Sequence, residues 1–204
     1  AFFPGDILVL YAIIGVVLIP VCRWSDRAVL ITAVILMLQP VEWGKFIYAM
    51  LHPDYMASAE QWLVHHRKMY PFLSQPDFWA MIKSNLWDGQ LFSFLWGWSY
   101  GRCFQTASLF MLGMLIGRKQ LFVNLAEHRT FWQRTFLIGL ICFIPLYYLS
   151  LSLPDLLTNR SMLTPMNTIV SSFRNFSFMC VLVSVFVFLW QQATSHKILY
   201  GLVP

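Results

Sequence analysis

Charged side chains are scarce in this sequence of 204 residues: only 11% are Asp, Glu, Lys or Arg, against about 25% in ordinary soluble domains. Hydrophobic residues make up 58% of the chain and aromatic residues 17%. This composition leaves too little polar surface to cover a soluble globule of this size. It also excludes a disordered, collagen-like or coiled-coil chain. The sequence therefore predicts a multi-pass membrane protein.

Metal-binding and nucleotide-binding motifs are missing as well. The four cysteines lie far apart, in or beside apolar runs, which indicates reduced thiols, with neither a disulfide framework nor a metal site. His65 and His66 are adjacent, so on a helix they lack the i, i+4 spacing of a zinc-binding pair. No P-loop, HExxH or dinucleotide-binding pattern occurs. The sequence shows no cofactor site.

A long basic stretch is also absent, although the net charge is +5. The 14 Lys and Arg residues, against 9 Asp and Glu, are spread along the chain, so no stripe of charge follows a nucleic-acid backbone. Such an excess is typical of charges that orient membrane spans. We expect the lipid bilayer as a partner and no nucleic acid.

Apolar runs predict an all-α transmembrane bundle within one membrane domain, each span needing about 20 apolar residues. Pro40 should kink the second span, because its ring removes a helix donor and clashes with the preceding turn. A polar stretch rich in Trp and Tyr is typical of short helices at the membrane interface. The five predicted spans are 7–22, 28–51, 91–117, 135–153 and 168–190, with the interfacial segment at 52–90.

The distribution of Lys and Arg predicts the orientation of the spans. The 23–27 turn holds two such residues and the 118–134 connector holds four, whereas the 154–167 loop holds one. The positive-inside rule therefore places the turn, the connector and the C-terminus in the cytoplasm. The 52–90 segment and the 154–167 loop are then expected to face outward.

Five ionisable residues interrupt the predicted spans near their outer ends. At about 1.5 Å per residue they lie roughly 20–25 Å from the inner boundary. Because ionisable groups within a span are costly and usually face a bundle interior or a wet cavity, they predict a polar, outward-open substrate pocket. These candidate binding residues are Asp6, Glu42, Lys45, Arg102 and Arg174.

Local interpretations of the same residues stay open. Lys and Arg side chains near helix ends can extend to the membrane surface. Glu42 and Lys45 are three residues apart and can pair on one helix. Asp6 follows Gly5 at the start of a span and can serve as an N-cap.

Several short motifs resemble those of the YeiB-like bacterial membrane proteins, a family with a domain of unknown function. The resemblance covers most of the chain in order. The matching residues are Pro4-Gly5-Asp6-Ile7-Leu8, Leu10-Tyr11-Ala12, Gly15, Ser25-Asp26-Arg27, Tyr100-Gly101-Arg102, Leu109-Phe110-Met111-Leu112-Gly113-Met114 and Gly117-Arg118.

The resemblance implies a multi-pass protein of the bacterial cytoplasmic membrane with one of two alternative activities. One is transport. The other, through a related superfamily of multi-span acyltransferases, is acyl transfer from a donor such as acyl-CoA to a small-molecule or glycan acceptor at the outer face. The family's natural catalytic candidates, an Arg in an earlier span and a His before the Gly-Asp-Ile-Leu segment, would precede Ala1. We therefore expect a piece of a longer protein that lacks parts at both ends, with the general base outside this sequence.

Three functions follow as hypotheses. In the leading one, a membrane-bound acyltransferase, Asp6, Arg102 and Arg174 line the acceptor pocket, and the Arg side chains fix an anionic or hydroxylated group. In the second, a transporter, the same residues form one gate of an alternating-access path. In the third, a non-catalytic structural subunit, the charges only set topology. If the protein kept full activity after both arginines were replaced by alanine, the third hypothesis would be favoured.

Overall fold

All regular structure in the described part of the chain is helical, as the sequence predicts. The computed structural model describes residues 8–52, 54–55, 61–73, 77–123 and 125–195; Asp6 lies outside these ranges. In chain order the elements are α1 (Leu8–Leu18), the 3₁₀ helix η1 (Pro20–Arg23), α2 (Asp26–Met37), α3 (Pro40–Leu51), α4 (Trp62–Leu73), α5 (Phe78–Ser84), the π-helix η2 (Asn85–Gly89), α6 (Gln90–Ser99), α7 (Arg102–Arg118), α8 (Arg129–Leu156) and α9 (Arg160–Ser195).

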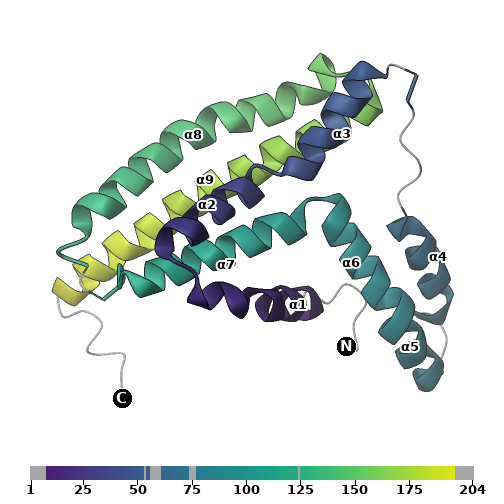
Figure 1. Ribbon diagram of the computed structural model, residues 1–204, viewed down its shortest axis with the longest axis horizontal. Helices are drawn as coiled ribbons and strands as arrows, with labels where there is room; N and C mark the ends of the chain where they lie inside the picture. Colours follow the sequence, from purple (N-terminus) through teal and green to yellow (C-terminus); the bar gives the residue numbers. More distant parts are fainter. Residues whose placement is uncertain (1–7, 53, 56–60, 74–76, 124, 196–204) are drawn as a thin grey trace.

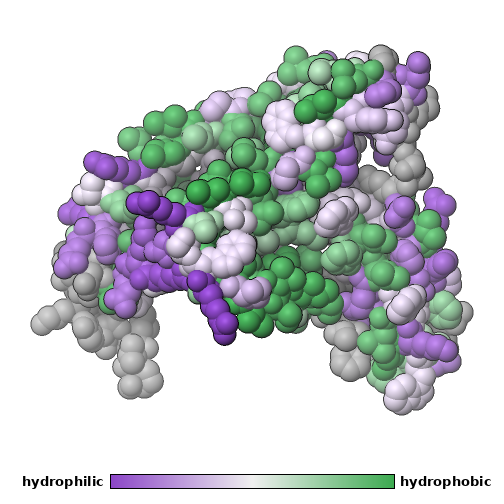
Figure 2. Space-filling model, in the orientation of Figure 1, coloured by the Kyte–Doolittle hydropathy of each residue, from purple (hydrophilic) through white to green (hydrophobic). Residues whose placement is uncertain are grey.

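The bundle is built around the long helix α9 (Figure 1). α8 packs along one side of α9 and α3 packs against its N-terminal half, while α2 and α1 pack on α7. α6 turns away from α7 and, with α4 and α5, projects sideways from the bundle. Hydrophobic side chains dominate the visible surface of α8 and its neighbours (Figure 2), which suits a lipid environment.

Three stretches are long and apolar enough to cross a membrane: Asp26–Leu51 (α2 with α3), Arg129–Leu156 (α8) and Arg160–Gln192 in α9. Leu8–Arg23 is apolar but shorter. On α8, Leu137, Ile138 and Ile141 are each more than half exposed, as expected for side chains that contact acyl chains. These observations establish a multi-pass membrane setting.

The helix boundaries differ from the predicted spans in two places. The predicted 91–117 span is divided into α6 and α7 at Tyr100-Gly101, because Gly101 adopts a left-handed conformation with φ 66° that a continuous α-helix cannot contain. The predicted 154–167 loop is shorter, because α8 continues to Leu156 and α9 begins at Arg160.

The predicted kink at Pro40 is confirmed. Pro40 is the first residue of α3, where a missing backbone donor costs nothing. Gln39, just before it, is left-handed with a φ of 56° and so lies outside the right-handed helical region, which proline disfavours for the preceding residue. The segment that spans Asp26–Leu51 is thus two helices joined at a sharp break.

Side-chain hydrogen bonds show which loops lie together at each end of the bundle. At one end, Arg118 donates to Asp26 Oδ1 at 2.8 Å and to the carbonyl oxygen of Trp24 at 3.0 Å, which joins the 23–27 turn to the start of the 118–134 connector. At the other end, Ser161 Oγ donates to the carbonyl oxygen of Tyr55 at 3.0 Å. The two segments predicted to be cytoplasmic therefore share one end, and α3 and α9 meet at the opposite end.

Substitution of Gly101 by Ala should destabilise the protein. A Cβ at Gly101 would lie 2.7 Å from Gln39 Oε1 and 2.8 Å from Thr168 Cγ2, and the left-handed backbone alone costs an L-residue about 1–2 kcal/mol. We expect a lower midpoint of thermal unfolding in detergent. Gly113→Ala is the matched control, because no atom lies within 4 Å of its added Cβ; equal midpoints for the two variants would contradict the prediction.

Candidate functional site

A buried polar junction joins the two helix breaks to α9. The side chain of Gln39 is fully buried; its Nε2 donates to the carbonyl oxygen of Gly101 at 2.9 Å and to Ser172 Oγ at 3.1 Å. Gln105 Nε2 donates to the carbonyl oxygen of Ser172 at 3.2 Å. The breaks at Gln39 and Gly101 therefore meet at one place on α9.

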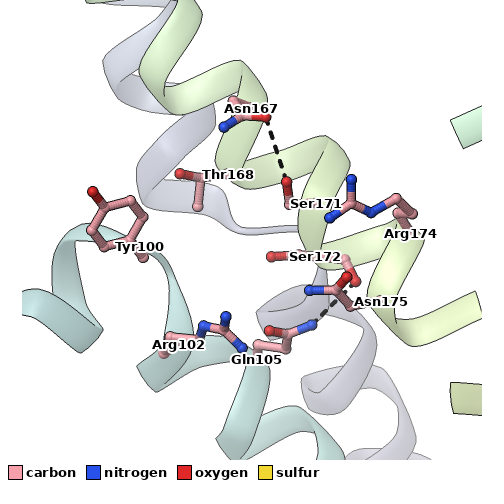
Figure 3. Close-up of a pocket in the computed structure, with 9 residues that line it drawn as sticks. All are labelled: Tyr100, Arg102, Gln105, Asn167, Thr168, Ser171, Ser172, Arg174 and Asn175. Carbon is pink, nitrogen blue, oxygen red and sulfur yellow. Dashed lines mark hydrogen bonds between the residues drawn. The ribbon is translucent and has the colours of Figure 1, made fainter. Parts of the chain in front are cut away.

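A polar pocket of about 150 Å³ opens beside this junction, between the start of α7 and the middle of α9 (Figure 3). Within the described part of the chain, its lining consists of two arginines, three amide side chains, three hydroxyl side chains and a tyrosine, with no carboxylate, imidazole or thiol. The lining residues are Tyr100, Arg102, Gln105, Asn167, Thr168, Ser171, Ser172, Arg174 and Asn175.

The structure brings two of the five sequence-predicted residues to the same pocket. Arg102 comes from the first turn of α7, and its guanidinium carbon lies 6.0 Å from the ring centroid of Trp96, within cation–π range. Arg174 comes from α9, and its Nη1 donates to Ser150 Oγ on α8 at 2.9 Å. Two positive charges from different helices therefore line one small space.

No carboxylate within the described residues neutralises this pair. The ion pairs formed there are Arg118–Asp26, Lys45–Glu42 and His65–Asp88, and none includes Arg102 or Arg174. α7 begins at Arg102 almost directly after α6 ends at Ser99, so the positive end of one helix dipole adjoins the negative end of the other and the two largely offset each other. The positive charge of the pocket therefore comes from the arginine side chains.

A second chamber of about 420 Å³ continues from the pocket towards the start of α9. It shares Tyr100, Asn167 and Thr168 with the pocket. Its other lining residues are Thr158, Arg160, Leu163 and Thr164. The two spaces therefore adjoin, and the second lies towards the end of the bundle predicted to face outward.

Glu42 and Lys45 do not line the pocket. They lie on α3 and pair with each other, with Lys45 Nζ 2.6 Å from Glu42 Oε1. The side chain of Glu42 is 3% exposed and that of Lys45 is 46% exposed. This geometry matches the alternative of a local i, i+3 pair. The remaining predicted residue, Asp6, lies outside the described residues.

The uncharged residues of the site were not predicted, because only ionisable residues within the spans were taken as candidates. Gln39 and Gln105 are single amides inside apolar runs. A usable signal exists on α9, where Asn167, Ser171 and Asn175 recur every four residues and therefore share one helix face. A polar stripe of this kind inside an apolar helix indicates a lined cavity as much as a charged residue does.

The histidines are not part of this pocket. His65 on α4 lies 2.8 Å from Asp88 on η2, measured from Nδ1 to Oδ1, with both side chains about a fifth exposed. His66 packs against the ring of Phe92. The two adjacent histidines thus have separate partners in the α4–α6 region.

The fold and the pocket define a multi-pass helical membrane protein with a polar cavity, and the comparisons with known proteins add one family match. Residues 116–204 match the family described as "Protein of unknown function (DUF418)". No match was found among curated proteins or among solved structures. The matched region contains α8 and α9, and hence Arg174, whereas Arg102 precedes it.

Loss of Lys45 should destabilise the protein more than loss of both charges. Lys45→Met leaves the buried Glu42 carboxylate without its ion-pair partner, which costs stability, and we expect a lower unfolding midpoint in detergent. The double variant Glu42→Gln/Lys45→Met removes both charges and should recover most of the loss. A double variant as unstable as Lys45→Met would argue against a purely local pair.

Proposed function

We propose that this chain forms part of a membrane transporter that binds a small polar substrate in the pocket between α7 and α9. The observation that carries the proposal is that the break in the α2–α3 span meets the start of α7 beside this pocket, where Gln39 donates a hydrogen bond to the carbonyl oxygen of Gly101. Discontinuous membrane helices are the usual means by which transporters place polar groups at a substrate site.

The depth of the junction supports transport. At about 1.5 Å per residue, Gln39 lies roughly 20 Å from Asp26 and roughly 18 Å from Leu51, midway along its span. Transporter sites typically lie near the middle of the membrane. On the inner side of the junction, an apolar cluster between η1, α2 and α7 fills the space; its buried residues are Val21, Val29, Ala33, Met111 and Leu115. With the pocket end facing outward, as the sequence predicts, this arrangement would correspond to an outward-open state.

Acyl transfer to an acceptor held in the same pocket is the second candidate. The apolar cluster favours it, because a site open on one side suits an enzyme that works at the outer face. The resemblance to YeiB-like proteins, with acyl-CoA as the donor, supports it too. Acyl transfer needs a general base, and the described lining residues supply none, so the base would have to come from elsewhere in the protein.

Thiol accessibility separates transport from a one-sided site. In full-length protein with its native cysteines replaced by alanine, Ser171→Cys should react with a membrane-impermeant maleimide. Transport predicts labelling in both right-side-out and inside-out vesicles, because the pocket opens alternately to the two sides. Ser108→Cys is the control, since Ser108 is fully buried against α2 and should stay unlabelled in both.

The labelling pattern assigns the outcome. Reaction of Ser171→Cys from the outer side alone would contradict transport and favour acyl transfer. Absence of reaction from either side, in a folded variant, would contradict a substrate pocket and leave a structural subunit.

Acyl transfer has its own direct measurement. Liposomes that contain the full-length protein are loaded with acetyl-CoA labelled in the acetyl group. Covalent label on an external acceptor, lost in Arg102→Ala, would establish acyl transfer and involve Arg102 in it. Label that stays on coenzyme A across a broad acceptor panel would count against this second candidate.

A further inference from the structure

We infer that the pocket between α7 and α9 recognises a dianionic oxyanion of the phosphate class, carried by its substrate; this inference rests on the proposed function of the same site. The pocket holds two guanidinium groups, Arg102 and Arg174, and lies at the N-terminus of α7. Arginine, a delocalised cation with a planar array of donors, is the side chain best suited to bind oxyanions.

The charge of the site matches two negative charges better than one. Among the described lining residues, Arg102 and Arg174 contribute two positive charges and no residue contributes a negative one. A phosphate monoester carries about −1.5 to −2 at pH 7, whereas a carboxylate carries a single charge. A phosphate group can therefore pair with both guanidinium groups at once.

The neutral lining complements the arginines. Ser171, Asn175 and Asn167 lie along one side of the pocket on α9 (Figure 3) and can donate to phosphate oxygens through hydroxyl or amide groups. Arg174 is anchored by Ser150, so part of the entropy of ordering its long side chain is lost before a ligand binds. The site is thus largely prepared for an anion.

The size of the pocket limits which part of the substrate it holds. A cavity of about 150 Å³ can hold a phosphate group or a molecule about as large as benzene. The rest of the substrate would extend into the second chamber, where Arg160 adds another positive side chain. Positive side chains along an entrance raise the local concentration of anions.

Phosphate binding to the full-length protein in phosphatidylcholine nanodiscs tests this inference. Inorganic phosphate should bind in calorimetric titration and raise the midpoint of thermal unfolding. Acetate should bind at least about tenfold more weakly, and glycerol should have no effect. Arg102→Gln and Arg174→Gln should each weaken phosphate binding by at least about tenfold, the loss expected for one charge-assisted hydrogen bond.

Two further variants keep the result interpretable. Asn175→Asp changes shape little but places a carboxylate in the pocket, so it should abolish phosphate binding even if an arginine variant misfolds. Arg134→Gln, on the part of α8 far from the pocket, should leave binding within about twofold of wild type, because an exposed charge at that distance is screened. Phosphate affinity that is insensitive to Arg102→Gln, Arg174→Gln and Asn175→Asp would overturn the inference.

A lipid headgroup can supply the same chemistry as a soluble phosphate compound. Nanodiscs that contain phosphatidic acid, without added phosphate, distinguish the two sources. Stabilisation by phosphatidic acid that is lost in Arg102→Gln would identify a lipid phosphate as the ligand. Stabilisation by inorganic phosphate alone, lost in the same variant, would identify a soluble one. An effect of either that survives Arg102→Gln would contradict the inference.

Failure of the inference is distinguishable from failure of the proposed function. If Ser171→Cys is labelled in vesicles but phosphate neither binds nor stabilises the protein, the pocket stands and the phosphate class is wrong. If Ser171→Cys is unreactive from both sides, the proposed substrate pocket itself fails.

Discussion

The hydrogen bonds of Gln39 to Gly101 and Ser172 are the interaction on which the rest of the site depends. Two helices break at left-handed residues, and each break leaves backbone polar groups that a lipid environment cannot satisfy. Packing the breaks against each other and against α9 lets a buried amide donate to the carbonyl oxygen of Gly101. The same contact fixes the start of α7, so the position of Arg102 follows from it.

A second constraint is the cost of charge within a membrane. The charged groups of the bundle are compensated in different ways. Glu42 is paired with Lys45 on the same helix, and Arg118 joins α7 to the 23–27 turn by bonds to Asp26 and to backbone carbonyls. Arg102 and Arg174 line a polar cavity instead. That difference separates charges that stabilise the fold from charges available to a ligand.

The pocket also shows why the family match describes only half of the site. Residues 116–204 contribute α8 and α9, with Arg174 and its anchor Ser150. Arg102, Gln39 and Gly101 come from the preceding part of the chain. The polar face of α9 is therefore completed by helices outside the matched region, and neither part forms the pocket alone.

The sequence by itself determined the membrane setting, the helical class and the kink at Pro40, because composition and proline chemistry are local properties. It did not determine that Glu42 and Lys45 pair away from the pocket, or that Gly101 divides the predicted 91–117 span. It also gave no sign that Gln39 lies beside Ser172, 133 positions later. Only the tertiary structure decided these points, because a left-handed glycine and a buried amide acquire their roles from neighbours that are distant in the sequence.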